Sequence, residues 1–346
     1  MERNRFIDVL KGILIILVIT LHFPIERAEQ LQYMFPFWAT LTVPCFMMIS
    51  GYVSALSYQK RAIGRPEEAY GTVRIAEQIL RFVIPYTIAF IAEWIVFRIF
   101  GLYTVNVRTY GIFALFLDYL RGGQGQGSYY FPVMIQFVFL FPIVYFVIRK
   151  YDLKGLAGCF VANGIFEILK TAYGMSDGEY RLLVFRYLFI IAAGCYMAIG
   201  KVRKNHKTVA LSVISIAVGG AFAYLFSYTD YNPKILTYWR TTSFAACLLV
   251  VPVLGRLIRK GTWKFAPLEI LGKASFNIFL VQMIYYNFAD HIYERIPYRP
   301  AQLAFNIFNC VAAGVLFYYI EKPLTKWVTG KLKQAATIRG KQKPAN

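Results

Sequence analysis

The sequence predicts an all-α integral membrane protein, a bundle of ten transmembrane helices with both termini in the cytosol. Of its 346 residues, 58% are hydrophobic and 16% are charged, whereas soluble domains average about 45–50% and about 25%. The apolar residues gather in segments long enough to cross a bilayer, which takes about 20 residues per helix. The ten segments are residues 6–24, 36–57, 82–100, 129–148, 155–173, 182–199, 208–228, 235–258, 268–289 and 301–327.

Several segments have recognisable ends. The first follows Arg5 and has no small-residue cleavage site after it, so we interpret it as a retained helix rather than a signal peptide. Arg81 precedes the third, which contains Pro85, a residue that interrupts the helical hydrogen bonds. The ninth combines small and polar residues that permit close helix packing.

We divide the chain into a membrane domain, residues 1–330, and a basic cytosolic tail, residues 331–346, predicted to be disordered.

The distribution of Lys and Arg gives the orientation. With the N-terminus in the cytosol, the inner segments hold 26 of these residues and the outer segments hold 11. Positive residues favour the cytosolic side, so this asymmetry predicts ten spans with both ends inside. The net charge of +20 therefore indicates topology and contact with anionic lipid headgroups, not with nucleic acid. We expect a multi-pass protein of the plasma membrane.

Other classes of site find no support in the sequence. The five cysteines lie scattered in apolar stretches without a C-x-x-C pair, so neither a disulfide framework nor a metal site is predicted. The longest outer connection, residues 101–128, contains the glycine-rich stretch 122–127. This stretch does not match the pattern of a phosphate-binding loop, and we interpret it as a mobile loop.

Ionisable residues inside the first segment are candidates for function, because each is costly in hydrocarbon. Lys11 and His22 are eleven residues apart, which places them within about 20° of one helix face and about 16 Å apart along the axis. Asp8 lies one turn before Lys11, close enough to pair with it. The alternative is that Asp8 and Lys11 extend to the inner headgroups and that His22 packs at the outer interface. Arg81 is likewise either a positive-inside anchor or a guanidinium directed at a phosphate.

Five stretches of the chain resemble the acyltransferase-three family of integral-membrane enzymes, which O-acylate carbohydrates. Lys11 and His22 fit that family's motif of Arg or Lys, ten residues, then His. The resemblance covers nearly the whole chain, and the family's ten-helix core equals the number of segments found above. Its stretches are DVLKG (8–12), FMMISGY (46–52), RFVIPY (81–86), LGKASFNIFL (271–280) and EKP (321–323).

Three positions depart from the family pattern. Gln78 stands where the family often has the first Arg of an Arg-x-x-Arg motif, which weakens the expected clamp on the donor's phosphates. Tyr129 and its neighbours open the fourth segment where a Trp is common. Gln282 occupies a place where the ninth helix commonly has a His. We take Tyr129 and Gln282 as candidates on the acceptor side.

The resemblance implies transfer of an acyl group, with acetyl expected, from cytosolic acyl-CoA to a hydroxyl of a cell-surface or lipid-linked carbohydrate. No cofactor would be permanently bound. A histidine suits the role of general base, so His22 is expected to deprotonate the acceptor or relay the acyl group. Lys11, Arg81 and Lys273 would hold the donor's phosphates, and Glu321 would orient one of these cations.

Two other interpretations stay open. A transporter or flippase for a charged lipid-linked saccharide would also need intramembrane charges and interrupted helices. A catalytically inactive scaffold within a polysaccharide-modifying assembly would explain the missing Arg and His. The acceptor sugar cannot be read from the outer loops.

Overall fold

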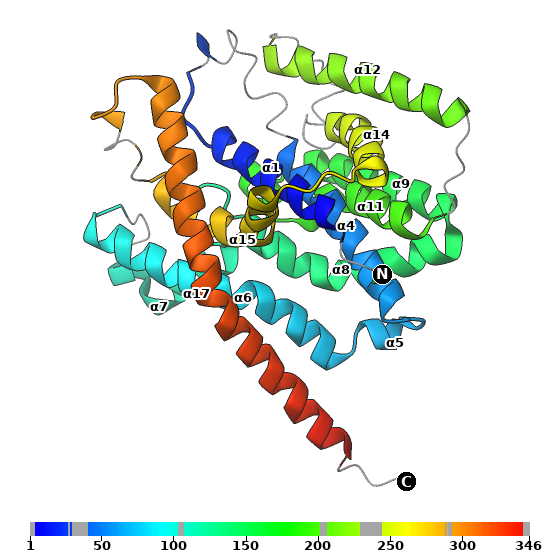
Figure 1. Ribbon diagram of the computed structural model, residues 1–346, viewed down its shortest axis with the longest axis horizontal. Helices are drawn as coiled ribbons and strands as arrows, with labels where there is room; N and C mark the ends of the chain where they lie inside the picture. The colour runs from blue at the N-terminus through cyan, green and yellow to red at the C-terminus, as the bar shows by residue number, and fades with distance from the viewer. Residues whose placement is uncertain are drawn as a thin grey trace. The chain divides into compact units, whose positions relative to one another are not determined.

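The computed structural model describes residues 4–26, 28–29, 41–102, 107–200, 206–228, 244–287, 289 and 293–341. Within these residues the chain is helical and contains no β-strand (Figure 1). The chain divides into two compact units, and each is described by itself. The first unit comprises Met1–Ile63 and Leu140–Lys273, and the second comprises Gly64–Phe139 and Ala274–Asn346.

Helices α8 and α15 each begin in one unit and end in the other. The first unit also holds α1 (Arg5–Leu21), α4 (Thr42–Lys60), α9 (Leu153–Ala172), α10 (Asp177–Arg181), the 3₁₀ turn η1 (Val184–Tyr187), α11 (Leu188–Ile199), α12 (His206–Tyr228) and α14 (Phe244–Lys260). The second unit also holds α5 (Pro66–Ala69), α6 (Thr72–Ile99), α7 (Val107–Arg121) and α17 (Arg299–Lys341). The two shared helices are α8 (Tyr130–Tyr151) and α15 (Ala266–Tyr285).

Helix α1 has clear start and stop signals. The Asn4 side chain accepts a hydrogen bond from the Phe6 N–H at 3.0 Å, which caps the otherwise unpaired N-terminal amides. The helix ends at Leu21, and His22 is its C-cap. Pro24 follows, and proline cannot continue a helix. These ends confirm the first predicted segment as a helix.

Glycines let four helices of the first unit approach to backbone contact. A Cβ at Gly51 of α4 would lie 2.3 Å from the Ile191 carbonyl oxygen of α11, and one at Gly194 of α11 would lie 2.0 Å from that of Met48. Helices α1 and α15 meet similarly, because a Cβ at Gly272 would lie 1.8 Å from the Asp8 carbonyl oxygen. The predicted close packing of the ninth segment is therefore confirmed at Gly272.

Gly272→Val should destabilise the protein. Its side chain would force α1 and α15 apart, and overpacking of this kind costs about 1–3 kcal/mol. We expect a lower midpoint of thermal unfolding in detergent. Gly158→Val is the matched control, because it makes the same change on helix α9, where a Cβ meets nothing within 4 Å. Equal midpoints for the two variants would contradict the close contact.

An aromatic cluster joins three helices of the second unit. Tyr86 of α6 stacks on Phe131 of α8, with ring centroids 3.6 Å apart and an interplanar angle of 15°. The Tyr86 hydroxyl donates to the Tyr119 carbonyl of α7 at 2.7 Å, so this buried polar group is satisfied. Helix α17 packs on α15, where a Cβ at Gly314 would lie 2.4 Å from the Ile278 Cα. The second unit is thus built from α6, α7, α15, α17 and the start of α8.

Helix α7 lies within the outer connection, residues 101–128, for which the sequence analysis predicted no helix. It occupies Val107–Arg121, and its backbone is non-helical at Gly111 (φ 63°, ψ −162°). This break divides the helix into pieces too short to show a clear apolar period, which explains why the sequence pattern missed it.

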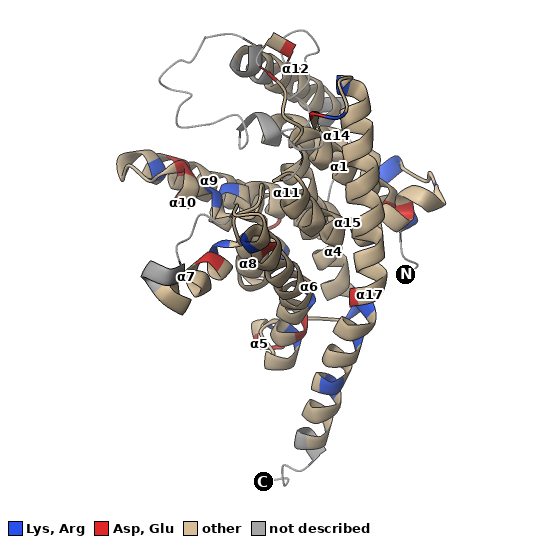
Figure 2. Ribbon diagram, turned by 90° about the vertical axis from the view of Figure 1, so that its left-hand side faces the viewer, with Lys and Arg blue, Asp and Glu red and all other residues tan. Residues whose placement is uncertain are grey.

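The predicted disorder of the tail is wrong for residues 331–341, which continue α17 (Figure 2). This stretch is rich in Lys, Leu, Gln and Ala, which favour helix, and no proline follows Pro323 until Pro344. Residues 342–346 lie outside the described part.

Each of the ten predicted apolar segments contains helix in its described part; residues 36–40, 235–243 and 288 lie outside that part. Among the described residues, three helices are long and apolar enough to cross a membrane, within Pro66–Ile99, Tyr130–Tyr151 and Arg299–Ile338. Two shorter apolar helices are Val184–Ile199 and Val209–Phe222. The ten-span count and the cytosolic termini stay predictions.

The orientation can be checked by labelling. Single cysteines at Gln126 or Tyr298, in a protein lacking its five native cysteines, should react with a membrane-impermeant thiol reagent in intact cells. Cysteines at Gly64 or Asn205 should not. Gln126, Tyr298 and Gly64 are exposed, so access should depend on the side of the membrane; Asn205 lies outside the described residues. Labelling at Gly64 but not at Gln126 would reverse the orientation inferred from the charges.

Candidate functional site

Three of the predicted polar residues lie on or at the end of α1, in the first unit. The Asp8 side chain is buried, at 4% exposure, and Lys11 is half-buried. His22 is also half-buried, and its backbone N–H donates to the Val18 carbonyl at 3.3 Å. His22 is the C-cap of α1, the residue that directly follows the last helical residue, Leu21. Lys11 thus lies within α1 and His22 directly after it, and their position on one helix face stays a prediction.

A charge pair that the sequence analysis missed joins α1 to α15. Arg5 Nε donates to Glu269 Oε2 at 2.8 Å, and the Glu269 side chain is 3% exposed. Gly272 follows on α15 against the Asp8 backbone, and the next residue, Lys273, is exposed. The helices that carry Lys11 and Lys273 are therefore in direct contact. Arg5 and Glu269 are 264 positions apart in the sequence, so no local sequence pattern could predict their contact.

In the second unit, Arg81 belongs to a cluster of two cations around one carboxylate. Glu77, 4% exposed, accepts hydrogen bonds from Arg81 one turn later on α6 and from Lys333 Nζ of α17, the latter at 2.9 Å. The Arg81 and Lys333 side chains are 55% and 53% exposed. The cluster therefore has a buried anionic centre, an accessible cationic exterior and a formal charge of +1.

Glu321 has neutral partners in the second unit. Asn277 Nδ2 of α15 donates to Glu321 Oε2 at 3.2 Å, and the Thr325 hydroxyl donates to the other carboxylate oxygen. Arg81 bonds to Glu77 instead. The expectation that Glu321 orients one of the donor-side cations, Lys11, Arg81 or Lys273, stays a prediction. Glu321 lies on α17, the helix that also carries Lys333 of the Glu77 cluster. Helix α6, which carries Glu77, contacts α15 where the Phe82 and Phe276 rings meet edge to face at 5.4 Å.

The two acceptor-side candidates lie where the glycine-rich stretch meets α15. Tyr129 is half-buried just before α8, and Gln282 is fully buried on α15. A Cβ at Gly125 would lie 2.5 Å from the carbonyl oxygen of Met283, which follows Gln282. The stretch that ends near Tyr129 and the helix that carries Gln282 are thus held together.

Glu93 of α6 anchors the glycine-rich stretch, a role that the sequence analysis missed. Its buried carboxylate accepts a hydrogen bond from the Gln124 backbone N–H at 3.2 Å and another from the Gly125 N–H. Gly123 has φ +89°, and a Cβ there would lie 2.3 Å from Glu93 Oε2. Glycine is therefore required at this position both by the backbone conformation and by the approach of the carboxylate.

The predicted site residues fall into two sets. Lys11, His22 and Lys273 belong to the first unit, and Arg81, Tyr129, Gln282 and Glu321 belong to the second. Within each set, packed helices carry the residues. Among the described residues, no group of three or more His, Cys, Asp or Glu side chains could hold a metal ion. The groups available for chemistry are an imidazole, exposed or half-exposed cations, and amide and phenol side chains.

Comparison with known proteins identifies the family. Residues 4–320 match a family model described as an acyltransferase domain, the third of the acyltransferase families. This match covers most of the chain and includes every candidate residue except Glu321, the residue next to its end. No curated protein and no solved structure matches the chain.

Proposed function

We propose that this chain, which belongs to the acyltransferase-three family, moves an acyl group from a cytosolic acyl-CoA to a hydroxyl of a carbohydrate on or bound for the cell surface. Membership of the family makes it a membrane acyltransferase. Acetyl as the acyl group, acyl-CoA as its donor, the carbohydrate acceptor and the plasma membrane as its location are our proposals. The observation that supports them most directly is the pairing of Lys11 and His22 on one helical element within the matched region.

His22 is proposed as the general base. In the reaction, the acceptor oxygen attacks the thioester carbonyl carbon, the C–S bond breaks, and the acceptor's proton must leave. An imidazole titrates near neutral pH and can take up that proton, then return it to the departing thiolate. The position at the end of α1 suits this role, because the backbone fixes the ring's origin while the half-buried side chain stays accessible.

The donor's phosphates are proposed to bind four cations that the charge distribution predicts to lie toward the cytosolic side. In the first unit these are Lys11 and the exposed Lys273. In the second unit Arg81 and Lys333 present accessible charge around Glu77. Arg supplies a planar fork that matches phosphate, and Lys supplies a mobile point charge. The sequence analysis predicts no role in donor binding for Lys333, because this residue lies in the tail that is predicted to be disordered.

Glu321 is proposed to orient one of the donor-side cations, and so to act as a positioning residue. Its hydrogen bond to Asn277 joins α15 to α17 and would keep the helices that carry the donor-side cations in register. Tyr129 and Gln282 are proposed to contact the acceptor sugar, because phenol and amide groups can hydrogen-bond its hydroxyls.

The test is transfer of radiolabel by the purified protein in proteoliposomes. Acetyl-CoA labelled in the acetyl group would be supplied on the cytosolic face, and candidate glycans or lipid-linked saccharides on the other. Label in the glycan, released by mild base as expected for an ester, supports the proposal. Movement of lipid-linked saccharide across the bilayer without acetyl-CoA, and without ester formation, would favour a flippase instead. The scaffold interpretation predicts neither signal.

A further inference from the structure

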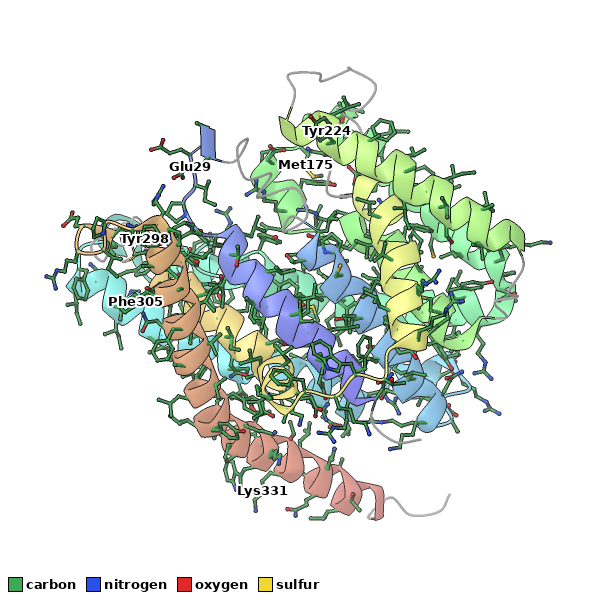
Figure 3. The ribbon with its side chains drawn as sticks, turned by 45° about the horizontal axis from the view of Figure 1, so that its top comes forward. Glu29, Met175, Tyr224, Tyr298, Phe305 and Lys331 are labelled. Atoms are coloured by element: carbon green, nitrogen blue, oxygen red, sulfur yellow. The ribbon has the colours of Figure 1, made fainter. Side chains whose placement is uncertain are left out.

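The first unit contains a large cleft that the proposed reaction does not use. Helices α9, α11, α12 and α14 line a space of about 1430 Å³. Sites for drug-sized ligands measure about 300–1,000 Å³, so the cleft has room for a longer molecule. Helices α12 and α14 are directly joined, because the Ser215 hydroxyl donates to the Leu248 carbonyl at 2.8 Å. Figure 3 shows α12, with Tyr224 labelled near its end, beside α14.

The walls of the cleft are apolar along most of their length. They include Phe160 of α9 and Phe189 of α11, whose rings meet edge to face at 5.1 Å. The side of α12 contributes Val209, Val213 and Ile216, and α14 contributes Val251. Val209 and Val213 are 56% and 62% exposed. Such a surface accommodates hydrocarbon, because each CH₂ group of a chain that leaves water adds to binding.

One end of the cleft carries three cations. Arg256, Arg259 and Lys260 lie on the last two turns of α14 and line the space. All three are exposed, and no ion pair is found for them within the described part of the chain. The described lining contains no Asp or Glu. The C-terminal end of a helix favours cations, so the cluster can form without a carboxylate partner and remains available to an anion.

We propose that this cleft binds an anionic membrane phospholipid, with its phosphate at Arg256, Arg259 and Lys260 and an acyl chain along α12 and α14. The charge complementarity selects an anionic headgroup, and the apolar walls select a ligand with a hydrocarbon chain. Residues 256–264 follow the eighth predicted span and belong to the inner segments of the charge count, so we expect them on the cytosolic side. Basic pockets between helices on that side bind anionic headgroups. The described lining of the cleft includes none of the residues proposed for acyl transfer.

The test is native mass spectrometry of the purified full-length protein with phosphatidylglycerol or phosphatidylcholine of identical chains. The parent protein should retain phosphatidylglycerol at least about tenfold more tightly, because each basic residue near an anionic lipid contributes a several-fold preference. The combined variant Arg256→Gln, Arg259→Gln, Lys260→Gln should lose that preference. A control with the same change in charge, Lys60→Gln, Arg61→Gln, Lys154→Gln, alters exposed residues away from the cleft lining and should keep it.

Two further arms separate the hydrocarbon from the phosphate. Val209→Trp fills the cleft but leaves its cations intact, and should weaken retention of phosphatidylglycerol. Glycerol 3-phosphate, which has the phosphate but no chains, should not compete. Retention of both lipids to the same extent, or unchanged retention in the charge variant and in Val209→Trp, would overturn the proposal. Preferential retention of palmitoyl-CoA over phosphatidylglycerol would also overturn it, since the occupant would then be a thioester and not a lipid.

Discussion

Replacing His22 by Gln is expected to lower the rate of acyl transfer by about 10²–10⁴-fold, the usual contribution of a general base. Glutamine keeps hydrogen-bonding capacity at the end of α1 but cannot take up a proton near neutral pH. The rate should be measured as label transferred from acetyl-CoA to glycan in proteoliposomes. Binding of the donor should change little, because His22 lies eleven residues after Lys11, about 16 Å along the helix axis.

The control is His22→Ala, measured for expression and membrane insertion as well as for rate. Alanine is well tolerated in helices, and the C-cap contacts of His22 come from its backbone N–H. Normal insertion with a lost rate supports the catalytic role, whereas loss of the folded protein supports a packing role. If His22→Gln, normally inserted, still transferred acyl groups at the parental rate, the proton-acceptor role would be wrong and the flippase would become the better interpretation.

Arg81→Ala is expected to weaken acyl-CoA binding about 10- to 100-fold, because a charge-assisted hydrogen bond contributes about 1.5–3 kcal/mol. The protein should still fold, because Lys333 still pairs with the buried Glu77 carboxylate, which is therefore not left as an unpaired charge. Donor affinity can be measured by isothermal titration with a non-hydrolysable acyl-CoA analogue. Lys11→Ala should weaken donor binding in the same way, and acceptor binding should be affected less in both variants.

Arg98→Ala is the matched control for Arg81→Ala. Arg98 is an exposed arginine in the last turn of the same helix, where its guanidinium lies over the Trp94 ring at 5.9 Å. Its removal deletes the same charge from α6 but away from Glu77 and should leave donor affinity unchanged. Equal affinities for the donor in the parent, Arg81→Ala and Lys11→Ala would show that these cations serve as topological anchors alone.

The sequence predicted features that depend on neighbouring positions. The first helix, its Lys11-to-His22 spacing and the close packing at Gly272 each follow from local pattern. The family also followed from short motifs in order. The partners of the site residues did not follow, because they come from distant parts of the chain. The Glu77–Lys333 contact, for example, joins positions 256 apart, and only packing of α6 against α17 creates it.

A second kind of error came from composition. Six residues rich in glycine suggested mobility, but Glu93 accepts their backbone amides and fixes the stretch. A basic, polar tail suggested disorder, but its residues favour helix and extend α17. In both places the sequence gives the intrinsic preference of the segment, and the observed conformation depends on a neighbour or on a preceding helix.

The length of α17 places Lys333, one of the cations proposed to bind the donor, near the end of the helix. At about 1.5 Å per residue, its 43 residues measure about 65 Å, twice the hydrocarbon thickness of about 30 Å. The hydrocarbon core therefore cannot enclose the whole helix. The last turns, which include Lys331 (Figure 3), extend beyond the core. Shortening the protein before Lys333 removes one of the two cations on Glu77 and reduces the charge of that cluster from +1 to zero. Truncations and C-terminal affinity tags are consequently not neutral choices when donor binding is measured.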